Sequence, residues 1–344
     1  MEITKPDEQW NDLCVMSNGG WFWQTREWID YTVLYKKGTD MSFMLKEGNQ
    51  AMAACPLILE GNEFSFGGGY TWTPVLHPSL NLKASTTTLA FIFKHIDEMA
   101  RVHKVVRSRF AIPPAAFCAN NFLPTFGYID ASINTRVINL QTSLENIRRG
   151  MWKGHAADVT VGERLFDVQV FNFSNITEAI FDEYCKLHYK DAGRLTRDPQ
   201  TFQMQLEWIK DNSAVLFGIH DGKEWIGFSY IFYYKYWAYY GSACSANMPG
   251  LPIGHALTWA AINWLRAHGF AYYELGWQRY ESDFWEPASD KEIAISKFKR
   301  HFGGYNDPLW RGEKYYDQRF FVDTVMSRVN AFNNHFAARE ESHA

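Results

Sequence analysis

The sequence predicts a mixed α/β (α+β) fold that consists of two consecutive modules with the same order of elements. Three strands, a loop rich in glycine and proline, a helix and a further strand occur in each half of the chain. The length of 344 residues exceeds the ~100–200 residues of a typical domain, which favours two modules over one. Aromatic residues make up 17% of the chain and the formal net charge is only −4, a composition typical of a folded core rather than of disorder.

The first module is expected over residues 1–142. Short apolar runs separated by Gly-containing turns predict three strands, at 42–46, 51–59 and 64–66. After a loop with two prolines, apolar residues spaced by three and four predict a helix over 85–102. A strand over 105–110 completes the module.

The second module is expected over residues 166–320, with the active site, after a helical and basic connector at 143–165. Two helices come first, at 182–190 and 199–211, the latter with Asp198 as its N-cap. The repeated pattern then predicts strands at 214–219, 225–233 and 236–242, a helix over 253–268 that Gly269 ends, and a strand at 271–275. Residues 321–344 are expected to form a C-terminal helix.

Composition and motif spacing exclude several function classes. The net charge argues against a strongly basic nucleic-acid binder, so no DNA partner is expected. No apolar run reaches the ~20 residues that span a bilayer, and the polar first residues do not predict a signal peptide. Five scattered cysteines without a C-x-x-C pair fit a reducing, cytoplasmic environment. Eleven histidines show no H-E-x-x-H spacing, so no metal site is expected.

Two short motifs stand near the ends of the chain, 22–28 (FWQTREW) and 297–304 (KFKRHFGG). They resemble the F-x-Q-[ST]-x-x-W entry and the F-K-x-x-F-G ending of the FemAB family of aminoacyl transferases. The Gly-rich segment 67–74 and the stretch from His188 to Phe202 are also similar, in the same order along almost the whole chain. The resemblance implies two tandem Gcn5-related N-acetyltransferase (GNAT)-like modules, each a mixed, mostly antiparallel sheet flanked by helices. It also implies an acyltransferase that acts on cell-wall precursors.

The acyl donor stays open, because the sequence departs from the family at two points. The second module has no long heptad stretch for the coiled-coil arm that tRNA-dependent members often carry. Residues 249–256 (PGLPIGHA) keep glycines before the central helix but lack the Arg or Gln of the acetyl-CoA-binding loop. We therefore expect no tightly bound cofactor, and as co-substrate an aminoacyl-tRNA, an acyl-CoA or an acyl-carrier protein.

Lys299, Phe298 and His255 are the candidate catalytic residues. Ser289 and Glu292 form a capping box that starts a helix, on which Ala294, Ile295, Phe298 and Phe302 share an apolar face with Lys299 beside it. A partly buried ammonium there could stabilise an oxyanion or hold a phosphate, and the alternative is a snorkelling lysine. The resemblance implies a catalytic role for Lys299. His255 lies at a helix N-terminus, whose free N–H groups suit an anion or an acyl oxygen.

Glu274 could act as a general base if burial raises its pKa, but an ion-paired strand residue is the favoured interpretation. The candidate substrate-binding residues combine positive charge with aromatic rings, which suits a phosphate or a stacked base. They are Arg194, Arg197, Tyr70, Trp72, Trp310, Arg311 and Lys314. Solvated charges and a plain edge strand are the alternatives. Ligand sites favour the interface of such modules, so a basic, aromatic-walled groove is expected there.

The expected activity is transfer of an acyl or aminoacyl group from an activated donor to an amine of a bulky, nucleotide- or sugar-linked cell-envelope precursor. The partners would be that small-molecule or sugar-nucleotide acceptor and a charged tRNA or a carrier protein. One alternative is an acyl-CoA-dependent N-acyltransferase that acts on an amino sugar. Another is a non-catalytic protein that binds a glycan or a precursor.

Overall fold

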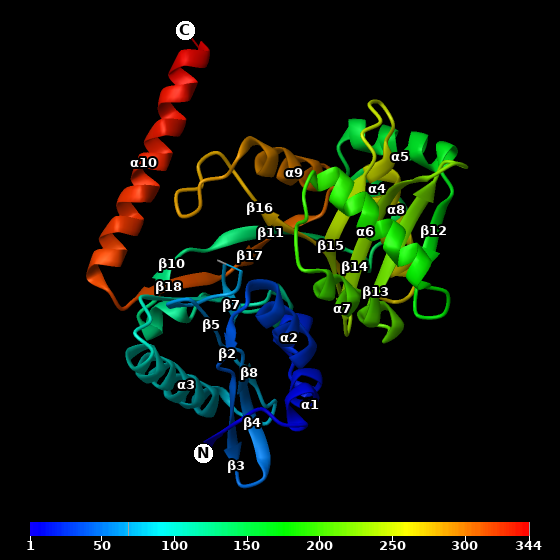
Figure 1. The fold of residues 1–344 in the computed structure, drawn as a ribbon. Coiled ribbons are helices and arrows are strands. Elements are labelled where there is room, and N and C mark those ends of the chain that lie inside the picture. Colours follow the sequence, from blue (N-terminus) through cyan, green and yellow to red (C-terminus); the bar gives the residue numbers. More distant parts are fainter. Residues whose placement is uncertain (68, 344) are drawn as a thin grey trace. The chain divides into compact units, whose positions relative to one another are not determined.

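The computed structural model describes residues 1–67 and 69–343, which form two compact units (Figure 1). Unit 1 consists of 1–134, 277–296 and 308–344, and unit 2 consists of 135–276 and 297–307. Both units are therefore discontinuous in sequence, whereas the modules expected from the sequence, 1–142 and 166–320, follow one another. Those module boundaries stay a prediction.

The strands of unit 1 belong to two sheets. A four-stranded antiparallel sheet has the order β1 (Glu2–Thr4), β3 (Phe43–Glu47), β4 (Gln50–Cys55), β8 (Val75–Leu76). A seven-stranded mixed sheet has the order β10 (Ile129–Asp130), β18 (Arg311–Tyr315), β9 (Arg107–Ala111), β6 (Glu63–Phe64), β5 (Ile58–Glu60), β2 (Thr39–Asp40), and β7 (Thr71–Trp72) also pairs with β9. β9 is parallel to β6 and β7 and antiparallel to β18.

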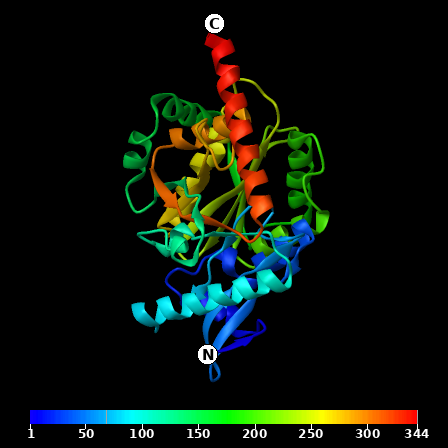
Figure 2. The ribbon, with the colours of Figure 1, turned by 90° about the vertical axis from the view of Figure 1, so that its left-hand side faces the viewer.

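The helices of unit 1 are α1 (Gln9–Met16), α2 (Arg26–Lys36), α3 (Leu82–Val102) and α10 (Gln318–His343), with short 3-10 turns at Phe22–Gln24, Pro114–Ala116 and Leu123–Phe126. The helix predicted over 85–102 is α3, which begins at the N-cap Asn81. Its residues Ile92, Phe93 and Ile96 are buried in the unit's core, and the helix crosses in front of the strands in Figure 2. The predicted C-terminal helix is α10.

Unit 2 is built on a seven-stranded mixed sheet that extends beyond the unit's limits at a few strand ends. Its order is β12 (Val168–Phe171), β13 (Ala214–His220), β14 (Trp225–Tyr234), β15 (Trp237–Ser245), β16 (Tyr272–Gln278), β11 (Ile133–Asn139), β17 (Tyr305–Leu309). Neighbours from β12 to β15 are antiparallel, whereas β15 and β16 are parallel. The mixed, mostly antiparallel α/β architecture expected from the sequence is confirmed.

Two irregularities in β15 interrupt the regular strand pairing of this sheet. The register between β15 and β16 ends at the pair Tyr239↔Glu274, although β15 continues to Ser245 and β16 to Gln278. At the same point β15 bulges, since Tyr240 and Ser242 pair with consecutive residues of β14 and Gly241 is the extra residue. The two parallel strands therefore diverge beyond Tyr239.

The helices of this part of the chain are α4 (Leu144–Arg149), α5 (Lys153–Leu165), α6 (Glu178–Ala192), α7 (Pro199–Lys210), α8 (Ile253–Ala267) and α9 (Asp290–His301). Asp198 caps α7 as predicted, because its side chain accepts a hydrogen bond from the Gln200 amide. The core of the unit packs α8 residues such as Leu257 and Ile262 against the sheet. In the described part of the chain, no helix is both long and apolar enough to cross a membrane.

The predicted apolar face of α9 is only partly right. Ser289 and Glu292 form the predicted capping box, and Phe302, just beyond the helix, is fully buried. Ala294 is exposed, however, and the Ile295 side chain is 43% exposed. The buried side chain in the first turns is instead the polar Ser296, whose hydroxyl accepts a hydrogen bond from the Arg279 amide. A periodicity argument that counts only apolar residues misses such a polar contact.

Candidate active site

Lys299 lies near the end of α9 and is surrounded by groups of unit 2. Its Nζ lies 5.1 Å from the centroid of the Tyr240 ring on β15, a cation–π contact. Among the described residues, no carboxylate oxygen lies within 4.0 Å of this nitrogen. Burial lowers the pKa of Lys299 to about 8, and the nearby charge of Glu274 opposes this shift only in part. The ammonium is therefore poorly solvated and has no direct ion-pair partner.

Glu274, in β16 at the last paired position before the strands diverge, is only 1% exposed. The Thr135 hydroxyl donates a hydrogen bond of 2.6 Å to its Oε1. Burial raises the pKa of Glu274 to about 8, and neighbouring Asp307 raises it further while Thr135 and Lys299 lower it. The prediction that Glu274 is an ion-paired strand residue is therefore wrong, because no cation lies in salt-bridge contact with it in the described chain.

Gly276 separates Lys299 from Tyr239. A Cβ atom at this position would lie 3.2 Å from Lys299 Nζ and 3.1 Å from the Tyr239 hydroxyl. Its φ of +95° is also a conformation that side chains with a Cβ rarely adopt. The glycine therefore lets the β16 backbone approach the ammonium and the tyrosine hydroxyl more closely than a residue with a Cβ could.

Phe298 of α9 contacts His255 of α8. The Phe298 ring lies 3.3 Å from where a Cβ of Gly254 would be, and its centroid is 5.0 Å from that of His255. His255 is in the first turn of α8, as predicted, and burial lowers its pKa. The three candidate catalytic residues are therefore all in unit 2, with Phe298 next to Lys299 in sequence and His255 against Phe298.

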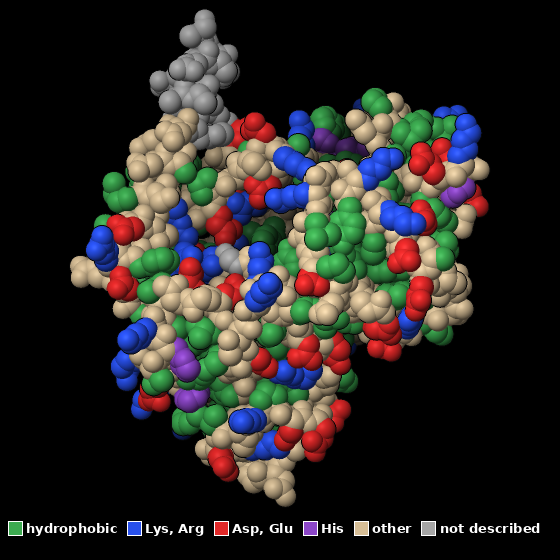
Figure 3. Space-filling view, viewed as in Figure 1, with side chains coloured by type: hydrophobic (Ala, Val, Ile, Leu, Met, Phe, Trp, Pro, Cys, Tyr) green, Lys and Arg blue, Asp and Glu red, His purple; other side chains and the backbone are tan. Residues whose placement is uncertain are grey.

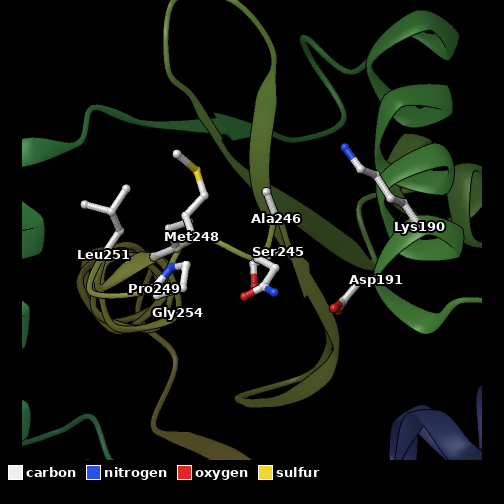
Figure 4. A pocket seen from close by; sticks show the side chains of 10 residues that line it. Lys190, Asp191, Ser245, Ala246, Met248, Pro249, Leu251 and Gly254 are labelled. Atoms are coloured by element: carbon white, nitrogen blue, oxygen red, sulfur yellow. The ribbon is translucent and has the colours of Figure 1, made fainter.

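A pocket of about 610 Å³ opens at the far end of β15, between α6 and the N-terminus of α8. In Figure 4 the α6 side chains lie on one side, the loop and the first turn of α8 on the other, and the end of β15 between them. It is lined by Lys190, Asp191, Ser245, Ala246, Asn247, Met248, Pro249, Leu251, Ile253 and Gly254. Only the Gly/Pro loop was noted in the sequence. The α6 residues were missed because they lie about 60 residues earlier in the chain.

The pocket and Lys299 are connected through two shared elements. β15 carries Tyr240, which contacts Lys299, and ends at Ser245 in the pocket wall. Gly254 lines the pocket and also packs against Phe298. The first turn of α8 has amide N–H groups without helical partners, a feature that favours anions or carbonyl oxygens. This arrangement can hold an extended ligand along β15 with a polar group near the ammonium.

The predicted aromatic and arginine residues of unit 1 are packed and bonded within that unit. Arg311 is fully buried and stacks at 4.1 Å on the Tyr70 ring, while its Nη1 lies 3.1 Å from a carboxylate oxygen of Glu286. The Tyr70 hydroxyl donates to Glu313 at 2.9 Å. Trp72 stacks on Trp23 at 4.1 Å. These contacts are those of a protein core.

Trp310 and Lys314 belong to unit 1 as well, although the sequence assigns them to the second module. The Trp310 indole donates to the Cys118 carbonyl at 2.7 Å, and Lys314 pairs with Asp97 at 2.7 Å. The physical reason is β18, which continues the unit 1 sheet by pairing with β9.

Arg194 and Arg197 lie on the α6–α7 loop of unit 2. Arg194 is exposed, and Arg197 lies 4.9 Å from the Phe202 ring centroid. Basic and acidic side chains are interspersed over the face seen in Figure 3. A substrate-binding role for these residues stays a prediction.

The fold is similar to that of several solved structures. No protein-family model matches the sequence, and no curated protein matches it significantly. FemX is 12% identical with a TM-score of 0.67, over 94% of this chain and 99% of FemX. L-PGS from Bacillus licheniformis is 13% identical with a TM-score of 0.60, over 97% of this chain and 100% of L-PGS.

A third match is a tandem GNAT protein from the clavulanic acid biosynthesis pathway. It is 13% identical with a TM-score of 0.51, over 91% of this chain and 98% of that protein. At such low identity a match shows the fold and not the substrate. All three matches cover more than nine tenths of this chain. The chain therefore has the FemAB-like tandem GNAT fold.

Proposed function

We propose that this protein transfers an acyl or aminoacyl group from an activated ester or thioester to an amine. The acceptor would be a bulky, nucleotide- or sugar-linked precursor of the cell envelope, and the reaction would take place in the cytoplasm. The fold supports the transferase class, and the acceptor class rests on the resemblance to the FemAB family.

The observation that carries the proposal is the position and state of Lys299. Its Nζ contacts Tyr240 directly after the point where β15 and β16 diverge. A pKa lowered to about 8 by burial means that the ammonium is weakly solvated and still mostly charged at neutral pH. Such a group gains much energy from a negative charge that develops beside it.

The chemistry follows from that position. The neutral amine attacks the acyl carbon, a C–N bond forms, and the carbonyl oxygen becomes an oxyanion that the Lys299 ammonium stabilises. The C–O bond of an ester or the C–S bond of a thioester then breaks, and the proton released by the amine passes to the leaving hydroxyl or thiol. Glu274 can assist the removal of that proton, because its pKa of about 8 suits a general base near neutral pH. No covalent intermediate on the protein is required.

Two classes of acyl donor are alternative occupants of the pocket at the end of β15. The family resemblance favours an aminoacyl-tRNA. The pocket itself, about 610 Å³ and bounded by the first turn of α8, favours a thioester carried on a long arm, as in an acyl-CoA or an acyl-carrier protein. A non-catalytic precursor-binding protein is the third possibility, and it predicts binding without turnover.

The test is a transfer assay with radiolabelled donors and a panel of nucleotide-linked amino sugars and peptides. The donors are tRNA charged with a mixture of amino acids, acetyl-CoA and a longer acyl-CoA. We expect transfer from one donor class, and a drop in kcat of about 10²–10³-fold in Lys299→Ala, the size seen when an oxyanion-stabilising group is removed. Lys297→Ala is the matched control, because Lys297 is exposed on the same helix and should leave kcat unchanged.

The outcomes separate the hypotheses. Full turnover by a folded Lys299→Ala variant would exclude the proposed role of Lys299. Transfer from acyl-CoA, and not from charged tRNA, to an amino sugar would establish the amino-sugar N-acyltransferase alternative. Binding of a precursor without transfer from any donor would establish the non-catalytic alternative.

A further inference from the structure

Two histidines and an aspartate converge between α5 and α8 in unit 2. One ring nitrogen each of His155 and His255 and a carboxylate oxygen of Asp158 lie within 4.8 Å of one another. The two imidazole centroids are 4.4 Å apart, and the His255 Nε2 lies 3.5 Å from an Asp158 oxygen. The sequence singles out His255 as a candidate catalytic residue, but the proposed transfer reaction gives the three side chains together no role.

The helix geometry explains why the three side chains meet. His155 and Asp158 are three residues apart on α5 and therefore share a face of that helix. His255 lies in the first turn of α8. The two helices can approach closely because Gly162 has no side chain, and a Cβ there would lie only 3.0 Å from the Ala256 Cβ. The site is thus held by packed helices rather than by loops.

The hydrogen bonds prepare the two imidazoles as ligands. The His155 Nε2 lies 3.1 Å from the Phe298 carbonyl oxygen, which can only accept, so this nitrogen carries the proton and Nδ1 keeps its lone pair. Histidines that bind metals commonly donate their other N–H to a carbonyl in this way. In the described chain the His255 Nε2 is buried without a hydrogen-bond partner.

We propose that His155, Asp158 and His255 bind a divalent transition-metal ion, with Zn²⁺ the best fit. Two imidazole nitrogens and one carboxylate oxygen suit zinc, whereas Mg²⁺ and Ca²⁺ prefer oxygen ligands alone. Zinc bonds of ~2.0–2.2 Å place tetrahedral ligand atoms roughly 3.3 Å apart, so modest side-chain rotations would close the observed spacing. Three protein ligands leave the fourth position for water or another ligand.

Such an ion would join three helices next to Lys299. It would fasten α5 to α8, and the His155–Phe298 hydrogen bond would extend this link to α9. The Phe298 ring already contacts both histidines, at centroid distances of 5.2 Å and 5.0 Å. This proposal differs from the expectation of no metal site, and it does not depend on the proposed transfer reaction.

The test uses the full chain without a histidine tag, stripped with a chelator and titrated with Zn²⁺ against a chromophoric chelator. We expect one ion per chain, a higher Tm with Zn²⁺, and at least about tenfold weaker binding in His155→Ala, His255→Ala and Asp158→Asn. Co²⁺ as a spectroscopic substitute should give visible absorption bands without the strong ultraviolet bands of thiolate ligands. The control is His103→Ala, since His103 is exposed after α3 in unit 1.

Two results would overturn the proposal. One is Zn²⁺ binding no tighter than about 100 μM by the unmodified chain. The other is equal affinity in the unmodified chain and in a folded His155→Ala/His255→Ala double variant, which would place the bound ion elsewhere. Circular dichroism of each variant separates loss of the metal site from loss of the fold. None of these readouts uses transferase activity, so the site and the proposed reaction can fail independently.

Discussion

Two regions of the molecule bury ionisable side chains, and they differ in whether an oppositely charged partner compensates for the loss of water. In unit 1 the Glu313 carboxylate is fully buried and receives hydrogen bonds from both terminal nitrogens of Arg328, each 2.8 Å long. Burial alone would raise its pKa, but the Arg328 and Tyr315 hydrogen bonds and the Arg107 charge lower it to about 2. In unit 2, neither Glu274 nor Lys299 has an oppositely charged group in salt-bridge contact among the described residues, and burial moves the pKa of each to about 8.

The difference separates a structural site from a reactive one. A buried charge with a complete set of partners stays ionised at all physiological pH values and cannot exchange protons usefully. When a buried acid and a buried base lack a full set of partners, their pKa values move toward neutral pH, and burying them lowers the folding stability. Charge density alone, by which the sequence singles out Arg311 and Lys314, does not distinguish the two cases.

The largest effect is expected from Glu313→Gln in the paired region. The substitution leaves the buried Arg328 guanidinium without the carboxylate that pairs with it. Arg107 loses a second carboxylate at 3.9 Å but keeps its 2.7 Å pair with Glu63. We expect the free energy of unfolding to fall by about 3–5 kcal/mol, as is typical when one partner of a buried ion pair is removed. Urea denaturation at pH 7 measures the change.

Glu145→Gln is the matched control for that substitution. Glu145 pairs with Arg149 four residues later on α4, but both side chains are well exposed, at 80% and 68%. Solvent screens such a pair, so the expected loss is at most about 0.5 kcal/mol. Similar losses in the two variants would show that the Glu313 network contributes no more than a surface ion pair.

The next effect concerns how stability depends on pH in the unpaired region. The Glu274 pKa is raised to about 8 in the folded chain, so the folded state keeps its proton between about pH 4.5 and 8 while the unfolded state loses it. This contribution is fully present below pH 4.5 and is lost as the pH rises through 8. Glu274→Gln should remove this fall, which amounts to about 1.4 kcal/mol per pH unit at most.

The measurement is the free energy of unfolding of both proteins at several pH values from 4 to 9. The difference between the unmodified chain and Glu274→Gln isolates Glu274 from the other titrating groups. Parallel curves would mean that the Glu274 pKa is not raised in the folded state. In that case Glu274 could not serve as a base near neutral pH in the proposed reaction.

The sequence predicted the element order of the second half well, because strand and helix periodicity and capping residues act locally. In the first half, the strand expected at 51–59 is divided into β4 and β5, which belong to different sheets. The caps at Asp198 and Ser289 and the helices α3 and α8 all lie where the pattern places them. The position of β18 could not be predicted in the same way. Its assignment to the unit 1 sheet depends on pairing with β9, about 200 residues earlier in the chain, which no local pattern reports.

The candidate site was predictable only in part. Lys299 and Phe298 could be found because they belong to one short motif on one helix. Glu274 was recognised as a possible base but judged to be ion-paired, since the sequence does not show whether a cation lies nearby. His155 and Asp158 went unnoticed because a pair three residues apart is common on helices, and only the packing of α5 on α8 brings His255 to them.

The smallest stability effect is expected at Lys299. Because this lysine has no described ion-pair partner, unlike Arg328, its removal should not lower the free energy of unfolding. Methionine has a similar length and no charge. Lys299→Met therefore removes a poorly solvated ammonium, and no described carboxylate loses a salt-bridge partner. We expect the free energy of unfolding at pH 7 to stay equal or to rise by about 1 kcal/mol, while transferase activity falls as in Lys299→Ala. Lys297→Met, on the exposed side of α9, should change neither quantity. A loss of more than about 1 kcal/mol in Lys299→Met would show that the ammonium has stabilising partners, like Arg328 in unit 1, and would place Lys299 with the structural charges.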